Sequence, residues 1–545
     1  MVIHYRKQRK DIKYQPQMSG LDIVRRFFPD KREAILCMGC DADLQSLNNQ
    51  IAKDTENIVF YDIQHPLGAH CLAISTVALM LMAAEGLFSD TRISVEHSFS
   101  KGFYCEALRQ DILPDNYLEL LQKKMDEHVR SGYEFEERIV SMEQIRDFNY
   151  KRFRVLKYSP RNKFRIYDLC GFPHWFISPL VPSASYIKKF RITPYDNGFV
   201  LEFPTQSSPD RIPEFTPSPN LFRVIRESEE RGKMLNIRHI CDLNAEALKG
   251  KQIRIIHLYE ALHEKKIAQI ADTISHDPTL RFIFIAGPSA SGKTTFMKRL
   301  SIQLRINGLK PKHLSLDDYF VERNDTPLDE HGKLDFEHFS AIDHQLLENQ
   351  LRGLMNGEGQ HLPRFIFERG KKQFAKEKTF LEQDEILVME GIHGLNPALA
   401  KHIPGDKKFR IYISALTQLN FNLYNRVSTS DTRLLRRMYR DFQFRGHSLE
   451  DTLLRWPSVR RGEDRWIFPF QENADVYFNS ALEYEWSVFS GVLLEQLRAL
   501  PGASPVKAEA ERLCSLMELF ISFEIDKIPP TSIIQEFLGK SSFDY

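Results

Sequence analysis

The sequence predicts an α/β fold for residues 276–500, preceded by two smaller α+β units. In 276–500, short continuous apolar runs alternate with helical patterns, as in parallel sheets covered by helices on both faces. In 1–204, strand-like and helical segments are mixed, and 165–200 alternates and carries aromatics, which is typical of strands. The predicted divisions are 1–62, 63–204, 205–275, 276–500 and 501–545.

The composition describes a folded protein without a dominant charge. The chain has 545 residues, of which 42% are hydrophobic, and 74 basic against 73 acidic residues give a formal charge of +1. These values exclude a chain that is disordered or polyanion-seeking as a whole, although a local basic patch stays open. The 7 cysteines are too few for a disulfide scaffold. The charged N-terminus lacks the apolar core of a secretory signal, so we expect a cytoplasmic protein that does not enter membranes.

The first unit should contain two strands and a helix. The apolar pattern predicts strands at Val2–Tyr5 and Ala34–Met38 and a helix at Gly20–Phe28. In the second unit, 64–84 carries no charged side chain, but its polar and helix-breaking start leaves about 14 residues of clean apolar helix, fewer than the roughly 20 that span a bilayer. We therefore expect a buried core helix there.

Later segments of the N-terminal half are less regular. A strand-turn is expected at Ser94–Cys105, a helix at Tyr117–Arg130 and strands within 165–200. The cluster of prolines between 204 and 219 predicts a linker, because proline denies the backbone regular pairing. A connecting amphipathic helix should end near Ile274.

Five apolar runs of the third unit are candidate strands of one parallel sheet: Phe282–Ala286, His313–Leu316, Ile386–Met389, Phe409–Ile413 and Val476–Phe478. The tail beyond 501 has a helical pattern.

The strongest chemical signal follows the first of these strands. It is the P-loop pattern Gly287-Pro288-Ser289-Ala290-Ser291-Gly292-Lys293-Thr294, continued by Thr295 into a helix. Backbone N–H groups of such a loop surround phosphate oxygens, and the helix N-terminus adds positive potential. Lys293 would contact the β- and γ-phosphates of ATP, and the Thr294 hydroxyl would ligate Mg²⁺.

Two acids follow neighbouring predicted strands. Asp317 comes after the second strand, where a carboxylate can take a proton from an attacking hydroxyl. Glu390 ends the third strand, where an acid can hold Mg²⁺ or its waters. Solvated turn residues at Asp317 and a helix cap at Glu390 are the alternatives.

Arginines repeat on one face of a later helix. Arg433, Arg437 and Arg440 follow an i, i+4, i+7 spacing. Like charges on one face are unfavourable unless an anion neutralises them, and a triphosphate would do so through forked hydrogen bonds. A solvated basic helix with Arg–Asp pairs is the alternative.

These motifs, with Leu334-Asp-Phe336-Glu337, Pro363-Arg-Phe365 and Glu390-Gly-Ile, resemble the uridine kinase and phosphoribulokinase family. The resemblance implies ATP and Mg²⁺ as cofactors and transfer of the γ-phosphate to a sugar hydroxyl. Its residue roles are Asp317 as base, Lys293, Arg437 and Arg440 at the phosphates, and Tyr319, Phe336, Glu337 and Phe365 around the acceptor. Uridine kinases usually carry Asp at 337, Tyr at 365, Asp at 366, His at 370 and Arg at 447, whereas this chain has Glu337, Phe365, Ile366, Gly370 and His447. These departures concern acceptor contacts, so the resemblance implies the reaction more firmly than the acceptor.

The first 204 residues resemble threonyl-tRNA synthetase, with a ubiquitin-like TGS domain over 1–62 and an editing-type domain over 63–204. Asp168-Leu-Cys170-Gly-Phe-Pro-His174 carries this resemblance. It implies a second site made of His70, Cys170 and His174, which could bind a metal, activate a water for hydrolysis, or be a retired site kept as packing. Long nucleoside kinases of bacterial type join the same parts, and the chain resembles them almost from end to end.

The sequence therefore predicts an ATP-dependent kinase of a small-molecule hydroxyl, foremost the 5′-hydroxyl of uridine, cytidine or a related nucleoside. Two other interpretations stay open: a kinase of another hydroxylated metabolite such as a sugar phosphate, and a nucleotide-regulated protein that binds tRNA or the ribosome through its N-terminal domains. The oligomeric state is also open.

Overall fold

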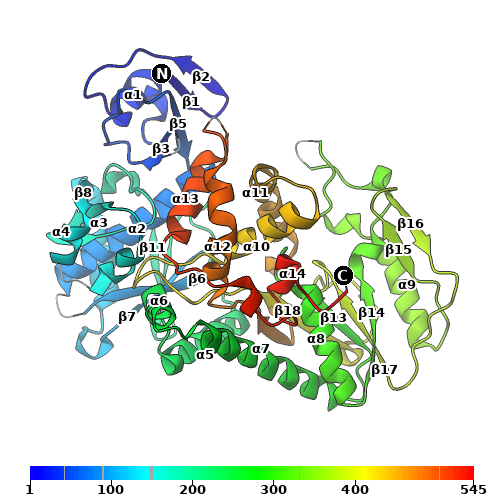
Figure 1. Cartoon of the computed structure of the whole chain (residues 1–545). Coiled ribbons are helices and arrows are strands. Elements are labelled where there is room, and N and C mark those ends of the chain that lie inside the picture. The colour runs from blue at the N-terminus through cyan, green and yellow to red at the C-terminus, as the bar shows by residue number, and fades with distance from the viewer. Residues whose placement is uncertain (42, 89–90, 148–150, 330–331, 503, 545) are drawn as a thin grey trace.

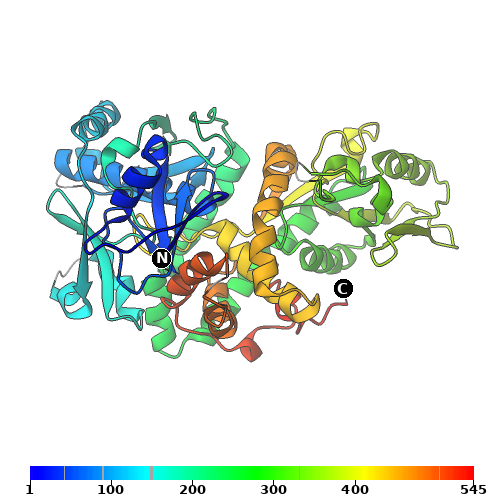
Figure 2. The same ribbon diagram turned by 90° about the horizontal axis from the view of Figure 1, so that it is seen from above.

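The computed structural model describes residues 1–545 except 42, 89–90, 148–150, 330–331, 503 and 545. The two N-terminal units lie at one end of the molecule and the parallel sheet of the third unit at the other (Figures 1 and 2). The C-terminal helices lie between these ends, so the last part of the chain contacts both halves.

One helix and a mixed five-stranded sheet form the first unit. The sheet has the order β2-β1-β5-β3-β4, with β1 (Val2–Tyr5), β2 (Gln8–Asp11), β3 (Ile35–Cys40), β4 (Asp43–Gln45) and β5 (Asn57–Asp62). Helix α1 (Gly20–Phe27) begins after Ser19, which forms a capping box with Asp22, and buries Ile23 and Val24 in the core of this unit. The two strands and the helix expected in this unit all form.

Two antiparallel sheets and a long apolar helix form the second unit. The sheets have the orders β10-β9-β8 and β11-β12-β7-β6, with β6 (Ile93–Phe99), β7 (Gly102–Ala107), β8 (Glu136–Ser141), β9 (Lys163–Leu169), β10 (Phe172–His174), β11 (Arg191–Tyr195) and β12 (Gly198–Glu202). The helices of this unit are α2 (Pro66–Leu87), α3 (Tyr117–Ser131) and α4 (Met142–Asp147).

Helix α2 is longer than the sequence led us to expect. It has 22 residues, because Pro66 is accommodated in the first turn and His65 Nδ1 accepts the Leu67 N–H as a cap. By length and composition it could cross a membrane, but 89% of its apolar window is buried inside the fold. It is the core helix of the second unit.

The segment 205–275 begins with the proline-rich stretch without helix and ends with the connecting helix, as expected, and it also holds two helices that we did not predict. Only its first part lacks helix, and it continues as α5 (Pro219–Leu235), α6 (Ile240–Leu248) and α7 (Gln252–Ser275). Pro219 opens α5, a position at which proline favours a helix. Ile267 and Ile270 of α7 share an apolar core with Phe296 of the third unit, so the predicted boundary at 275 divides one core.

The third unit contains the predicted parallel sheet. Its order is β14-β17-β13-β18-β19, and all neighbours are parallel, with β13 (Phe282–Ala286), β14 (Lys310–Ser315), β17 (Glu385–Glu390), β18 (Lys408–Ser414) and β19 (Val476–Asn479). Alternate residues of β13 enter different cores: Ile283 and Ile285 pack on one face, Phe282 and Phe284 on the other. Burial on both faces explains the continuous apolar runs in the sequence.

The sheet is accompanied by a hairpin and several helices: β15 (Pro363–Ile366), β16 (Lys371–Phe374), α8 (Lys293–Ile306), α9 (His344–Met355), α10 (Thr429–Phe444), α11 (Leu449–Trp466) and α12 (Glu485–Arg498). The chain ends with α13 (Lys507–Met517) and the short α14 (Gln535–Leu538). Ile533, Ile534 and Phe537 are fully buried in the same core as α7 and α8. The segment beyond 501 is therefore part of the third unit's core.

Candidate active site

The P-loop connects the central strand β13 to helix α8. A Cβ on Gly287 would lie 2.0 Å from the carbonyl oxygen of Ile413, so only glycine fits where the loop passes β18. Gly292 has a φ of +86°, in the left-handed region, and α8 begins directly after it without a side-chain cap within the loop. The first N–H groups of α8 have no partners within the helix, which makes this end an anion-binding position.

The Lys293 side chain turns back onto the loop. Its Nζ donates to the carbonyl oxygens of Gly287 at 3.0 Å and Pro288 at 3.2 Å. The ammonium is thereby held beside the position that the motif predicts for phosphates.

The two predicted acids lie at the carboxyl edge of the sheet. In the β14–β17 pair, Ser315 is the direct partner of Glu390, and the Ser315 hydroxyl donates to Glu390 Oε1 at 3.5 Å. Asp317 follows in a short 3₁₀ turn (Leu316–Tyr319), and its N–H donates to the Ser315 hydroxyl at 3.3 Å. The sheet register therefore places both carboxyl groups near the P-loop.

Electrostatics connect these acids to Lys293. Burial raises the pKa of Asp317, and the Lys293 ammonium opposes this shift. Burial also raises the pKa of Glu390 to about 7, against the effect of Lys293 and together with the charge of Asp317. Several carboxyl groups thus share one ammonium, an arrangement that favours binding of an additional cation or proton.

Glu337 joins this cluster from a loop. Burial raises its pKa to about 7, with Glu463 and Asp317 adding to the shift and Arg437 and Lys293 opposing it. Among the described residues its Oε2 atom is buried and has no hydrogen-bond partner. A buried acceptor without a partner is costly, and a ligand hydroxyl would satisfy it.

The predicted acceptor-side aromatics differ in exposure. Phe336 is 36% exposed, and its ring meets that of Phe320 edge to face at 5.7 Å. Phe365 is nearly buried and packs on the same Phe320 ring, while its N–H donates to Asp318. Tyr319 is fully buried, and its hydroxyl donates to Gln350 Oε1 at 2.7 Å. The prediction of Tyr319 as an acceptor contact is therefore wrong in this structure, because its side chain is buried and its hydroxyl forms an internal hydrogen bond.

Among the predicted arginines of α10, Arg437 contacts a side chain of the P-loop, whereas Arg440 is paired with Asp441. Arg437 Nη1 donates to the Ser289 hydroxyl at 2.8 Å, and its Nε lies 3.3 Å from Asp441 Oδ2. Arg440 Nη2 lies 2.8 Å from Asp441 Oδ1. Asp441 thus partly neutralises both arginines. Such Arg–Asp pairs were part of the alternative interpretation of this helix.

Arg433 does not face an anion site as predicted. Its guanidinium is fully buried and forms a two-pronged pair with Glu463 of α11. Glu463 Oε1 also accepts the Ser289 N–H at 3.1 Å. Glu463 neutralises the charge of Arg433, so the repulsion expected from the arginine spacing does not arise. The spacing along α10 does not reveal this partner, because Glu463 lies on α11.

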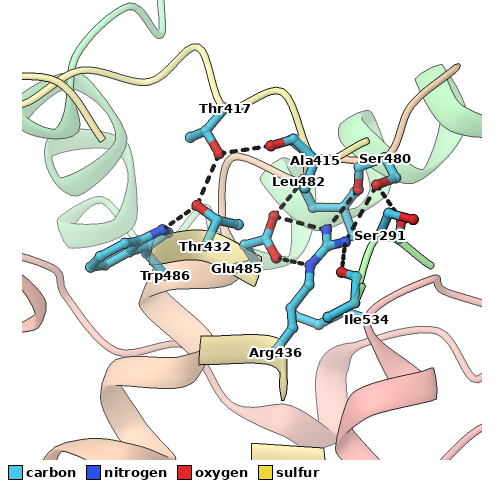
Figure 3. A network of polar contacts seen from close by, with 12 residues as sticks. Ser291, Ala415, Thr417, Thr432, Arg436, Ser480, Leu482, Glu485, Trp486 and Ile534 are labelled. Carbon is cyan, nitrogen blue, oxygen red and sulfur yellow. Dashed lines mark hydrogen bonds and ion pairs between the residues drawn. The ribbon is translucent and has the colours of Figure 1, made fainter. Parts of the chain in front are cut away.

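Arg436 plays a similar structural role beneath the loop (Figure 3). Its Nε donates to Glu485 Oε2 at 2.5 Å, and its Nη2 donates to the Ser480 carbonyl at 2.8 Å. The Ser480 hydroxyl donates to the Ser291 carbonyl at 2.6 Å. This network connects the P-loop to the end of β19 and the start of α12. Its members are far apart in the sequence, so the sequence alone does not indicate that they interact.

The second site predicted from His70, Cys170 and His174 is not assembled. His174 Nε2 lies 3.0 Å from Glu85 Oε2, near the end of α2. His70 lies near the start of α2, about four turns away, roughly 22 Å at 1.5 Å per residue. Burial, together with the nearby charge of Arg512, lowers the pKa of His70 to about 4. Within the described ranges, no group of three or more His, Cys, Asp and Glu side chains is arranged for a metal.

Comparison with known proteins places this site in a family. The sequence profile of the Phosphoribulokinase / Uridine kinase family matches residues 282–485. A uridine kinase of Serratia proteamaculans is 30% identical over 199 residues, which are 36% of this chain and 84% of that protein. The chain belongs to the phosphoribulokinase/uridine kinase family. A uridine kinase of Halobacterium salinarum is 26% identical over 195 residues, 36% of this chain and 77% of its own length.

Solved structures with similarity to the chain include a possible uridine kinase from Bacillus stearothermophilus, with 19% identity and a TM-score of 0.27 over 39% of this chain and 97% of that one. As a member of the phosphoribulokinase/uridine kinase family, the chain is a kinase with a nucleotide-binding P-loop. The family match includes the P-loop, both sheet-edge acids and α10, and leaves residues 1–281 outside it.

Proposed function

We propose that the chain transfers the γ-phosphate of ATP to a hydroxyl of a small molecule, foremost the 5′-hydroxyl of uridine, cytidine or a related nucleoside. The observation that carries this proposal is the placement of Asp317, Glu390 and Glu337 around one lysine of the P-loop. Such transfer depends mainly on positioning and electrostatic stabilisation, which this cluster can supply.

Each group has a defined task in this proposal. The first-turn amides of α8 and the Lys293 ammonium hold the phosphates. Asp317 accepts the proton of the attacking hydroxyl, and its raised pKa brings it closer to neutral pH, where a base transfers protons most effectively. Arg437, already hydrogen-bonded to Ser289 of the loop, stabilises charge on the moving phosphoryl group together with Arg440.

One residue at the start of α8 and one at the sheet edge also fit Mg²⁺. Thr294 and Glu390 offer the hard oxygen ligands that this ion prefers, and the pKa of Glu390, raised by burial to about 7, indicates a carboxylate without sufficient positive charge nearby. When bound, the ion would neutralise phosphate charge during transfer.

The acceptor side supports a hydroxyl-rich ring compound. Glu337 has a buried oxygen without a partner among the described residues. The rings of Phe336 and Phe365 both pack edge to face on the ring of Phe320. A ribose hydroxyl would satisfy the carboxylate, and the aromatic rings would pack on a flat base. A sugar phosphate would bind less well, because its negatively charged phosphate would lie close to the carboxylate of Glu337 and be repelled by it.

A panel of acceptors tests this proposal. Uridine, cytidine, adenosine, thymidine and several sugars and sugar phosphates are incubated with Mg²⁺ and radiolabelled ATP, and the products are separated. We expect a pyrimidine ribonucleoside to give the highest kcat/KM. A sugar phosphate as the preferred acceptor would contradict the nucleoside assignment, whereas transfer to none of them would contradict the proposed reaction.

The role of the N-terminal half belongs to the same proposal. Following the resemblance to threonyl-tRNA synthetase, we propose that residues 1–62 and 63–204 are TGS-like and editing-like domains that contact RNA, in a cytoplasmic enzyme. Binding of tRNA at several salt concentrations tests this. If the domains contact RNA phosphates, the logarithm of the binding constant falls linearly with the logarithm of the salt concentration. Tight tRNA binding with no phosphorylation of any acceptor would favour the RNA-binding alternative for the whole protein.

A further inference from the structure

The C-terminal segment 531–539 lies directly on the P-loop. A Cβ on Gly292 would lie 2.4 Å from Ile533 Cγ2, so the segment touches the glycine that precedes α8. Ile533 and Phe537 are fully buried, and the Phe537 ring lies 5.2 Å from the guanidinium carbon of Arg436. The segment is therefore packed in place, and Ile534 appears beside Arg436 in Figure 3.

The carboxylate of Glu536 in this segment accepts hydrogen bonds from two donors at the end of the P-loop. The Thr295 N–H donates to Glu536 Oε2 at 3.1 Å, and the Thr295 hydroxyl donates to the same oxygen at 2.7 Å. Thr295 is in the first turn of α8, where N–H groups lack helical partners and where nucleotide phosphates bind in a P-loop. A carboxylate oxygen thus accepts hydrogen bonds from an N–H and a hydroxyl of the helix end that a phosphate would also use.

Its charge acts on the rest of the site as well. Glu536 is one of the negative charges that, after burial, raise the pKa of Glu390. An additional carboxylate at the mouth of the loop repels an incoming polyphosphate, and its two hydrogen bonds have to break before a phosphate can use the same donors.

We propose that segment 531–539 is an autoinhibitory strap, in which Glu536 occupies a phosphate position of the P-loop and leaves when ATP binds. This rests on the proposed function only in that the P-loop takes ATP. The strap is connected to both sides of the site. Ser532 donates to Glu260 of α7 at 2.5 Å, and a Cβ on Gly539 would lie 2.0 Å from the Phe444 ring at the end of α10.

Calorimetric titration with ATP, without any acceptor, tests the strap. Glu536→Gln keeps the shape of the side chain and removes its charge, and Glu536→Ala removes the carboxyl group. We expect both variants to bind ATP with a Kd about tenfold lower than wild type, a change of about 1.4 kcal/mol. Glu524→Gln, which removes an exposed carboxylate of the same tail, is the matched control and should bind ATP as wild type does.

Thermal unfolding without nucleotide shows whether each variant is folded. If Glu536→Ala is not folded, the isosteric Glu536→Gln variant alone is used for the binding test. Lys293→Ala gives the reference for lost nucleotide binding. An unchanged or weaker ATP affinity in Glu536→Gln, with Lys293→Ala still abolishing binding, would overturn the strap and leave the proposed function intact. ATP binding to none of the proteins, Glu536→Gln included, would overturn both.

Discussion

The P-loop and the histidine–cysteine group of the second unit were both recognised as sequence motifs, but only the first forms a site. The P-loop residues are consecutive, and their positions follow from one strand, one turn and one helix start. His70 and His174 come from distant parts of the chain, and the long helix α2 keeps them apart. A motif within one turn forms its site through local backbone geometry alone. A motif whose residues lie on several elements forms a site only if those elements pack so that the residues meet.

The largest expected effect concerns the P-loop side of this comparison. Lys293→Ala should lower kcat on the order of 10³-fold, because it removes the only ammonium among three carboxyl groups of the described site. Steady-state phosphorylation of the preferred acceptor measures this. Lys310→Ala, at an exposed lysine paired with Asp384, is the control and should change kcat by less than about twofold.

A second prediction separates structural from functional charges next to the loop. Glu463→Ala leaves the buried guanidinium of Arg433 without its partner and should destabilise the protein by about 3–5 kcal/mol, measured by denaturant unfolding. Arg437→Ala removes a partly exposed group and should lower kcat far more than stability. Equal loss of stability in both variants would contradict this division.

A third prediction concerns pH. The pKa of Glu390 is raised by burial to about 7 from an ordinary 4.5, so the folded state binds a proton that the unfolded state has released. Its contribution to stability is therefore complete below about pH 4.5 and is lost as the pH rises through about 7. Glu390→Gln should flatten the decrease in melting temperature between about pH 5 and 8 that wild type shows without nucleotide. Identical slopes for the two proteins would refute this.

The smallest effect is expected in the second unit. Cys170 is exposed and His70 lies far from it, so purified wild type should contain no bound zinc in stoichiometric amount. Cys170→Ser should leave phosphorylation within about twofold of wild type. Stoichiometric zinc that disappears in the Cys170→Ser protein would show that the dispersed motif does assemble.

The sequence predicted the parallel sheet well, because strands buried on both faces have continuous apolar runs. It missed α5 and α6 within 205–275, where Pro219, the last proline of the predicted linker, starts a helix. It also failed for Arg433 and Tyr319, whose partners Glu463 and Gln350 belong to other elements. Spacing along one helix cannot reveal such partners, and the same holds for Glu536 at the P-loop.

The central claim is that Asp317 accepts the proton of the acceptor hydroxyl beside the nucleotide phosphates. Asp317→Asn tests it most directly when kcat and the Kd for ATP are measured on the same preparation. We expect kcat to fall about 10²–10⁴-fold, the usual contribution of a general base, while the Kd for ATP stays within about twofold. A kcat close to that of wild type with normal ATP binding would contradict the claim.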